Sequence, residues 1–318
     1  MTGAFLHQPV MLVEVVEALT PRPDAIYLDA TFGRGGYSRA LLEAADCQVV
    51  AIDRDPDAIA AGQGLADAFP GRLTLCHGRF SQLATLAANV GKAKYDGVVF
   101  DLGLSSPQID AAERGFSFRH DGPLDMRMEK SGPDASDFVN SASPQRLERV
   151  LRDYGEERAA RRITRAICKA REDAPITRTL QLAEIIRAVM PRPKPGQIDP
   201  ATRTFQAIRI EINEELDEIR QAMLAAERCL NPGGILAVVS FHSLEDRIIK
   251  RFMRERSDAA PRPSRHQPDI DRPQPSFSLV TRRPITPGEA ETETNPRARS
   301  ARLRVAIRTD APAQQEAA

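Results

Sequence analysis

Residues 29–37 read DATFGRGGY, a glycine-rich turn that follows an apolar, strand-like run and opens an Ala/Leu-rich helix. A strand, a glycine turn and a helix in this order are typical of a nucleotide-binding sheet, in which the ligand lies outside the carboxyl ends of the strands. Glycine lets the backbone adopt positive φ and approach a ligand closely. An ordinary glycine-rich turn has the same composition, so this interpretation depends on the residues at the ends of the neighbouring strands.

The surrounding sequence alternates between strand and helix patterns. Strands are predicted at 25–30, 48–52, 73–76 and 97–100, and helices at 37–45, 56–68 and 81–90. This alternation predicts an α/β fold with a doubly wound parallel sheet. Later in the chain we expect one long helix from residue 205 to the Asn231-Pro232-Gly233-Gly234 turn, then a buried parallel strand at 235–240. Residues 277–282 and 301–308 are predicted to pair as a hairpin at the sheet edge.

From about residue 110 to residue 205 the pattern is helical, without strand-like alternation. One helix has a clear beginning at Ser143-Pro144, an N-cap followed by proline at the first helical position. The sequence therefore predicts a discontinuous domain, 1–109 with 206–318, and an inserted helical domain, 110–205.

An acidic residue follows the second predicted strand. Asp53 lies about 20 residues beyond the glycines, where a carboxylate binds ribose hydroxyls in nucleotide-binding sheets. The dinucleotide fingerprint G-x-G-x-x-G fails, because its last position, counted from Gly33, is Ser38. A ribose outside a nicotinamide dinucleotide is therefore favoured. We interpret Asp55 as the N-cap of the helix that Pro56 opens.

The third and fourth predicted strands also end in residues suited to a ligand. Phe80 follows the third and could cover an adenine ring, or equally pack in the core. The segment from Asp101 to Gln108, DLGLSSPQ, follows the fourth. Glycines, an acid for ribose, an aromatic ring and a second acid thus follow four parallel strands, which favours one shared crevice over four unrelated loops.

At these residues the chain resembles the class I methyltransferases that use S-adenosylmethionine, and among them the RsmH/MraW family of 16S ribosomal RNA cytosine-N4 methyltransferases. The longest matching motifs read DGPLDMRM at 121–128, SFHSLEDR at 240–247 and NPRARS at 295–300. All matching segments lie at 7–12, 29–36, 51–56, 101–108, 113–118, 121–128, 154–158, 200–207, 240–247 and 295–300.

The resemblance implies a Rossmann-like class I methyltransferase fold, S-adenosylmethionine as cofactor, and a decoding-centre (P-site) cytidine of the small ribosomal subunit as substrate. It also implies that the inserted domain recognises the substrate. Histidine is common in the family at position 37, where this chain has Tyr37, so a side-chain contact there is in doubt. The implied cofactor contacts, with Gly33 of the same loop, are Gly33, Gly35, Gly36, Tyr37, Asp53, Phe80, Asp101 and Gln108.

The residues bear on which atom receives the methyl group. Methylation at cytosine C5 needs a cysteine nucleophile, and only Cys76 lies near the crevice, where a buried strand thiol is its more ordinary role. Methylation of an exocyclic nitrogen needs positioning and an acceptor for the amine hydrogen. The candidates are Asp101, then Ser105 or Ser106, and His242, for which a strand-end histidine bonded to backbone is the alternative.

Two features could contact RNA. Phe116 and Phe118, next to Arg114 and Arg119, suit a splayed-out base. Two phenylalanines at this spacing more often pack on the core, but the interleaved arginines and the Gly122-Pro123 turn favour an RNA contact. Basic residues also crowd one inserted helix, which is either an RNA contact or a solvated face: Arg158, Arg161, Arg162, Arg165, Lys169 and Arg171.

Composition limits the remaining possibilities. The 318 residues carry 44 Lys+Arg and 44 Asp+Glu, which excludes a uniformly basic coat but not a local basic face. No apolar run reaches the roughly 20 residues that span a bilayer, and no signal peptide is predicted. Four cysteines without a CxxC pair predict no metal site and a reducing, cytoplasmic setting. The sequence leaves a homodimer open, and also whether naked RNA or the assembled subunit is the substrate.

Two other functions remain as hypotheses. A nucleotide-dependent oxidoreductase has a similar sheet, but Ser38 replaces the third glycine and no hydride-site motif is visible. A non-catalytic RNA-binding assembly factor could keep the fold, but such a protein would be free to lose the glycine loop, Asp53 and Asp101.

Overall fold

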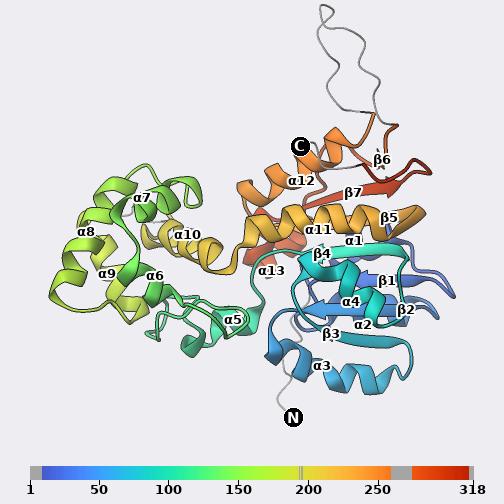
Figure 1. Cartoon of the computed structure of the whole chain (residues 1–318), viewed down its shortest axis with the longest axis horizontal. Coiled ribbons are helices and arrows are strands. Elements are labelled where there is room, and N and C mark those ends of the chain that lie inside the picture. Colours follow the sequence, from blue (N-terminus) through green and yellow to red (C-terminus); the bar gives the residue numbers. More distant parts are fainter. Residues whose placement is uncertain (1–8, 193, 195, 259–273, 315–318) are drawn as a thin grey trace, which may run out of the picture. The chain divides into compact units, whose positions relative to one another are not determined.

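The computed structural model describes residues 9–192, 194, 196–258 and 274–314. His7 and Gln8 of the first matching motif lie outside these residues. The chain divides into two compact units, one formed by Met1–Gly103 with Leu216–Ala318 and the other by Leu104–Glu215 (Figure 1). The second unit begins earlier and ends later than the predicted 110–205. The two units are described separately below.

The first unit is built on a seven-stranded sheet in the order β3-β2-β1-β4-β5-β7-β6. The first five strands pair in parallel, which confirms the predicted doubly wound sheet. The edge hairpin is also confirmed, since β7 pairs antiparallel with β5 and β6 with β7. The strands are β1 Ile26–Asp29, β2 Gln48–Asp53, β3 Leu73–His77, β4 Tyr95–Asp101, β5 Leu230–Ser240, β6 Phe277–Leu279 and β7 Arg302–Arg308.

The strand order reverses between β1 and β4, and this reversal determines where a ligand can lie. The chain leaves β1 toward β2 and leaves β4 toward β5, so the loops after these two neighbours diverge and open a crevice at their carboxyl ends. The glycine turn follows β1 and Asp101 ends β4. The sheet topology therefore brings the predicted strand-end residues of this unit to one edge.

Both faces of the parallel strands are covered, as their apolar sequences require. Tyr27 and Leu28 are consecutive residues of β1 and both are buried. Helices α1, α2 and α3 contribute Val15, Leu41 and Leu65 to one core cluster with the strands. The helices of this unit are α1 Leu12–Leu19, α2 Gly36–Ala44, α3 Pro56–Ala68, α4 Leu83–Asn89, α11 Glu215–Cys229, α12 Ser243–Glu255 and α13 Glu289–Thr294, with 3₁₀ turns at Phe80–Gln82 and Pro296–Ser300.

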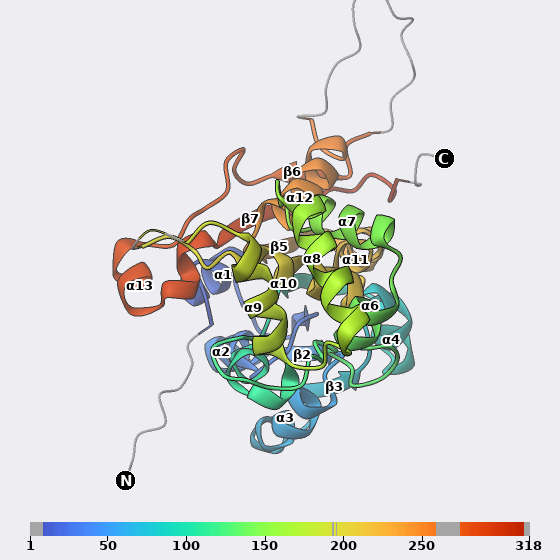
Figure 2. The ribbon, with the colours of Figure 1, turned by 90° about the vertical axis from the view of Figure 1, so that its left-hand side faces the viewer.

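The second unit consists of helices and loops (Figure 2), with one isolated bridge between Pro123 and Arg178, and has its own core. Leu147, Ile163, Leu182 and Ile208, from four different helices, are fully buried within it. Its helices are α5 Ser106–Asp110, α6 Ala135–Ser141, α7 Pro144–Asp153, α8 Ala160–Asp173, α9 Thr179–Val189 and α10 Ala201–Asn213, with a 3₁₀ turn at Ala112–Arg114.

The single long helix predicted from residue 205 is wrong, because the chain breaks at Glu214. This residue has φ 53° in the left-handed region, which ends α10 before α11 begins at Glu215. Arg209 and Glu215 form a bidentate pair across the break, with N–O distances of 2.7 and 2.8 Å. Both helices bury apolar residues, so the helical periodicity continues through the break and does not reveal it. The structure accordingly places α10 in the inserted unit, beyond the predicted boundary at 205.

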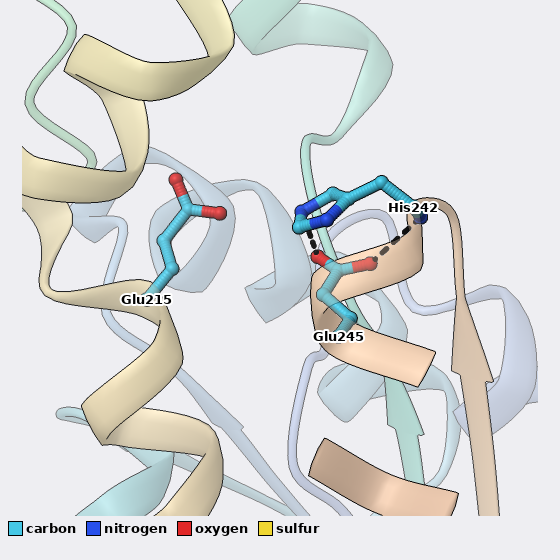
Figure 3. A group of neighbouring side chains, drawn as sticks. All are labelled: Glu215, His242 and Glu245. Atoms are coloured by element: carbon cyan, nitrogen blue, oxygen red, sulfur yellow. Dashed lines mark hydrogen bonds and ion pairs between the residues drawn. The ribbon is translucent and has the colours of Figure 1, made fainter. Parts of the chain in front are cut away.

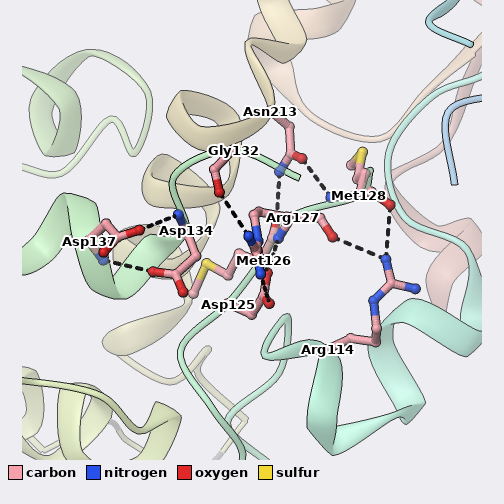
Figure 4. Close-up of polar contacts among 9 residues, drawn as sticks. All are labelled: Arg114, Asp125, Met126, Arg127, Met128, Gly132, Asp134, Asp137 and Asn213. Carbon is pink, nitrogen blue, oxygen red and sulfur yellow. Dashed lines mark hydrogen bonds and ion pairs between the residues drawn. The ribbon is translucent and has the colours of Figure 1, made fainter. Parts of the chain in front are cut away.

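Asn213, the last residue of α10, holds the loop that precedes α6 (Figure 4). Its side-chain oxygen accepts the N–H of Met128 at 2.9 Å, and its amide nitrogen donates to the carbonyls of Met126 at 2.8 Å and Arg209 at 2.9 Å. Met126 has φ 61°, a conformation that costs free energy in a non-glycine residue. One buried amide thus satisfies three backbone groups around a strained residue.

Two arginines complete this loop (Figure 4). Arg114 donates to the carbonyls of Arg127 and Met128, each at 3.0 Å. Arg127 pairs with Asp125 through two hydrogen bonds of 2.8 Å and donates to the carbonyl of Gly132. Side chains that hydrogen-bond to backbone groups therefore hold the DGPLDMRM motif in place. Its charged residues Asp125 and Arg127 stabilise the loop.

We expect Asn213→Ala to lower the free energy of unfolding by about 2–4 kcal/mol, because it leaves buried backbone groups of Met126 and Met128 without partners. Denaturant titration of both proteins measures the difference. The control Asn231→Ala removes a half-buried amide whose hydrogen bond to Asp96 is 3.4 Å long, and should change stability by no more than about 0.5 kcal/mol. Equal losses in the two variants would contradict this role for Asn213.

Candidate functional site

The glycine turn is shaped by what packs beneath it. Gly33 and Gly35 have positive φ, 54° and 73°. A Cβ on Gly35 would lie 2.7 Å from the ring of Phe32, and one on Gly36 would lie 2.0 Å from Pro9. Gly35 is the N-cap of α2 and provides no side chain to cap it. The first turn of this helix therefore has backbone N–H groups without side-chain capping, to which a polar ligand group can bind.

Asp53 connects the glycine turn to the end of β2. One carboxylate oxygen accepts the N–H of Gly33 at 2.7 Å and the other accepts the N–H of Asp55 at 2.8 Å. Burial raises the pKa of Asp53, against these two hydrogen bonds. A carboxylate offers about four acceptor positions, so both oxygens retain one for a ligand hydroxyl. Asp55 caps α3 by accepting the N–H of Asp57 at 3.0 Å, which confirms its predicted role.

Phe80 begins the 3₁₀ turn after β3 and is half-buried. Its ring meets that of Phe100 edge to face, with centroids 5.9 Å apart, and Phe100 is fully buried in β4. A core ring thus holds Phe80 while part of its surface stays exposed. This arrangement suits contact with a flat ligand group.

Asp29, at the end of β1, is a buried carboxyl group that the predicted site did not include. Ser38 donates its hydroxyl to one oxygen at 2.7 Å, and the N–H of Thr31 reaches the other at 3.2 Å. Burial raises the pKa of Asp29 to about 6 despite these bonds. Its position directly before the glycine turn, at the carboxyl end of a buried strand, was the signal that could have identified it.

Asp101, at the end of β4, lies close enough to Asp29 for their charges to interact. Its backbone N–H donates to the Thr31 hydroxyl at 2.6 Å, which links the ends of β1 and β4. Its Oδ1 is buried and has no hydrogen-bond partner among the described residues. Burial, then the charges of Asp29 and Glu245, raise the pKa of Asp101 well above its usual range. A buried acceptor without a donor is costly, and a cationic or N–H-bearing ligand would relieve that cost.

The Tyr37 side chain points into the core and away from solvent. Its hydroxyl donates to the carbonyl of Val10, and only 3% of the residue is exposed. Burial, then the charges of Asp101 and Asp29, raise the pKa of the Tyr37 hydroxyl well above its usual range. The Tyr37 side chain is therefore part of the core, and only the backbone at this position is left for a cofactor contact.

His242 follows β5 and is paired with a carboxylate that the sequence interpretation missed (Figure 3). Its Nε2 lies 3.0 Å from Oε1 of Glu245, which is an ion pair when the ring is protonated, but neither ring nitrogen has hydrogen-bond geometry to a described residue. The other oxygen of Glu245 accepts the backbone N–H groups of Phe241 and His242 at 2.8 and 3.3 Å. An acid three residues into a helix is the capping-box signal that could have identified Glu245. Glu215, also drawn in Figure 3, belongs to the inserted unit.

The remaining predicted site residues belong to the inserted unit. Ser105 is the N-cap of α5, and its N–H donates to Oε1 of Gln108 at 3.1 Å. Ser106 and Gln108 are buried. Of the predicted residues, the sheet edge of the first unit gathers Gly33, Gly35, Gly36, Tyr37, Asp53, Phe80, Asp101 and His242.

Phe116 and Phe118 do not form the predicted exposed base platform. Phe116 is buried in the core of the inserted unit. Phe118 packs against Phe205, with ring centroids 4.7 Å apart, and the guanidinium of Arg187 covers its ring. The more ordinary interpretation of this spacing, core packing, is the one the structure favours.

The cysteines give no exposed nucleophile in the sheet. Cys76 is buried in β3, and burial raises the pKa of its thiol, which disfavours the reactive thiolate. Among the described residues, no helix is both long and apolar enough to cross a bilayer.

Comparison with known proteins identifies relatives along almost the whole chain. The model of the MraW methylase family matches residues 4–309. The ribosomal RNA small subunit methyltransferase H of Azorhizobium caulinodans is 57% identical over 311 residues, which cover 98% of this chain and 89% of the relative. The protein of the same name from Paramagnetospirillum magneticum is 53% identical over 309 residues, 96% of this chain and 97% of the relative.

The buried carboxyl of Asp29 predicts a pH dependence. Its pKa in the folded protein, about 6, exceeds the value of 3.8 for a free side chain, so its contribution to stability falls as the pH rises from about 4 to 6. Asp29→Asn does not titrate and so removes this loss of stability. Its amide oxygen can still accept the N–H of Thr31, and its amide nitrogen can donate to the Ser38 hydroxyl. The stability of the variant relative to wild type should therefore rise between pH 4 and 7 by on the order of 2–3 kcal/mol. Denaturant titrations of the unliganded proteins measure it, and a difference independent of pH would contradict the shift.

Proposed function

Since this chain belongs to the MraW methylase family, we propose that it transfers a methyl group from S-adenosylmethionine to the exocyclic N4 of a decoding-centre cytidine in 16S ribosomal RNA. The relatives named above act on small-subunit ribosomal RNA by name. The class I methyltransferase fold agrees with this assignment. The choice of cytidine and of N4 is part of the proposal and rests on the family resemblance.

The observation that carries the proposal is the arrangement of acids at the β1–β4 reversal. Asp29 and Asp101 are buried there, and Oδ1 of Asp101 lacks a donor among the described residues. S-Adenosylmethionine supplies a methyl group activated on a sulfonium, and its ammonium group gives it a second positive charge. Such a cation would lower the raised pKa values of these acids and provide the missing donor. Asp53 would accept the ribose hydroxyls, Phe80 would cover the adenine, and the glycine turn would approach the cofactor closely.

The chemistry requires positioning and a place for one proton. The N4 lone pair attacks the methyl carbon in line with the departing sulfur, and an amine hydrogen must then leave. Asp101 and His242 are candidates in the first unit, and Ser105 and Ser106 in the inserted unit. Oε1 of Glu245 lies 3.0 Å from Nε2 of His242, so the carboxylate would stabilise the imidazolium formed if His242 accepts the proton. Burial of Cys76 disfavours the covalent route to C5.

The direct test uses methyl-labelled cofactor and small subunits that lack the modification. After incubation and digestion to nucleosides, we expect the label in N4-methylcytidine. Label in another nucleoside, or none, would contradict the proposal and leave a different methyl acceptor or a non-catalytic RNA-binding role. Parallel reactions on protein-free RNA and on assembled subunits decide which of them is the substrate. Such a substrate also favours a cytoplasmic location.

Asp53→Ala tests the cofactor site. It removes acceptors for the ribose and should weaken S-adenosylmethionine binding by about 1–3 kcal/mol, measured by calorimetry. Asp57→Ala is the control, because it removes the same charge from an exposed position four residues away on α3. Unchanged affinity in Asp53→Ala would mean that other groups hold the ribose.

Asp101→Asn and His242→Gln separate binding from proton transfer. Loss of a group that accepts the amine hydrogen should lower kcat roughly 10²–10⁴-fold while cofactor affinity stays near wild type. We expect this for His242→Gln, whereas Asp101→Asn should also weaken cofactor binding, because in the proposed complex its buried oxygen would face the cofactor charge. Single-turnover rates and calorimetry on the same samples distinguish the two effects. Wild-type rates in both variants would exclude both residues as acceptors.

A further inference from the structure

One inserted helix carries cations that no other charge in the described structure neutralises. Arg158, Arg161, Arg165 and Lys169 are exposed, and none of them forms a side-chain hydrogen bond or an ion pair with a described residue. They are spaced three or four residues apart along α8 and the turn before it, so they share one side of the helix. We call these four residues the α8 stripe. Ile163 and Ile167, on the opposite side, are fully buried.

Some exposed arginines on other helices do have carboxylate partners. Arg39, Arg152 and Arg220 each pair with a carboxylate on their own helix, three or four residues away. Between Arg158 and Arg171 the sequence contains six basic residues and no acidic one. Arg162 reaches only the sulfur of Met190, and Arg171 a backbone carbonyl of Val139. Arg149 on α7 and Arg228 on α11 are also exposed without a carboxylate partner among the described residues, so what distinguishes the α8 stripe is that four such cations share one side of a single helix and the turn before it.

The α8 stripe is unfavourable for the helix on its own. Like charges three or four residues apart repel each other, and cations in the first turn oppose the helix dipole. The first turn of α8 contains no acid, and its N-cap, Ala159, makes no side-chain capping bond. Polyanion binding would reverse both effects, because phosphates neutralise the stripe and bind favourably near a helix N-terminus.

We propose that the α8 stripe is a phosphate-backbone contact surface of the inserted unit, which binds ribosomal RNA independently of base sequence. This inference rests on the proposed function, which identifies the partner as ribosomal RNA. It assigns to the α8 stripe a role in binding affinity for that RNA, separate from the reaction. The charge of the whole chain is zero, so attraction to RNA has to come from a local surface of this kind. Contacts with phosphates position the substrate, whereas base recognition belongs to other residues.

The test compares two triple variants with equal loss of charge. Arg161→Gln/Arg165→Gln/Lys169→Gln removes three members of the α8 stripe, and Arg39→Gln/Arg152→Gln/Arg220→Gln removes three exposed arginines that are already paired. Binding to protein-free small-subunit RNA is measured over a range of salt concentrations. The stripe variant should bind about tenfold or more weakly at low salt, and its slope of log K against log salt should fall in magnitude by about 2. The control should keep the wild-type slope.

Further measurements make the outcomes decisive. Arg161→Lys/Arg165→Lys should retain the wild-type salt slope, since it keeps the charge. Thermal melts should show the stripe variant at least as stable as wild type, because repulsion between the cations is relieved.

Wild-type affinity and slope in the stripe variant would overturn the inference while labelled N4-methylcytidine still supports the proposed function. Loss of binding to assembled subunits but not to protein-free RNA would also overturn it, in favour of a ribosomal protein. Weakened RNA binding without any methylated product would support the α8 stripe and contradict the proposed reaction.

Discussion

The burial of two carboxyl groups at the reversal of strand order is the constraint on which the rest of the site depends. β1 and β4 are neighbouring parallel strands, so Asp29 and Asp101 both lie at the same edge of an apolar sheet, close enough for their charges to interact. The fold satisfies Asp29 with Ser38 and Thr31 but leaves one oxygen of Asp101 without a donor among the described residues. Proteins retain such unfavourable burial where a ligand compensates for it. The glycine turn, Asp53 and Phe80 lie at the same edge, and their proposed role in binding the cofactor depends on that position.

The inserted unit has a different physical basis. Its helices bury a core of their own, and the loop before α6 is held by the Asn213 amide and by arginines that bond to backbone. Charged residues within the longest sequence motifs therefore serve structure, whereas the unpaired cations of α8 lie outside the DGPLDMRM, SFHSLEDR and NPRARS motifs. A motif-based interpretation would have assigned function to the first group and a solvated face to the second. In the structure, the motif charges have backbone or carboxylate partners, whereas four cations of α8 and its preceding turn have none among the described residues.

Most of the first unit could be predicted because its signals are local. Strand and helix alternation, the glycine turn and the N-cap Asp55 each depend on residues close in sequence, and all are observed. The break at Glu214 could not be predicted, because both helices remain amphipathic across it. The Glu245 partner of His242 was missed, although the acid stands where a capping box requires one. Phe116 was ambiguous in sequence and became core through helices far along the chain.

By itself, the sequence determined the fold class and the edge of the sheet at which the predicted site residues of the first unit gather, because parallel strands place their carboxyl ends together whatever else the chain does. It also determined the family, through long motifs in a constant order. Only the tertiary structure decided which side chains face that edge. The Tyr37 hydroxyl donates to the carbonyl of Val10 in the core, Oδ1 of Asp101 has no donor among the described residues, and the α8 stripe has no carboxylate partner there. Each of these outcomes depends on what packs against the residue from distant parts of the chain, and no local pattern contains that information.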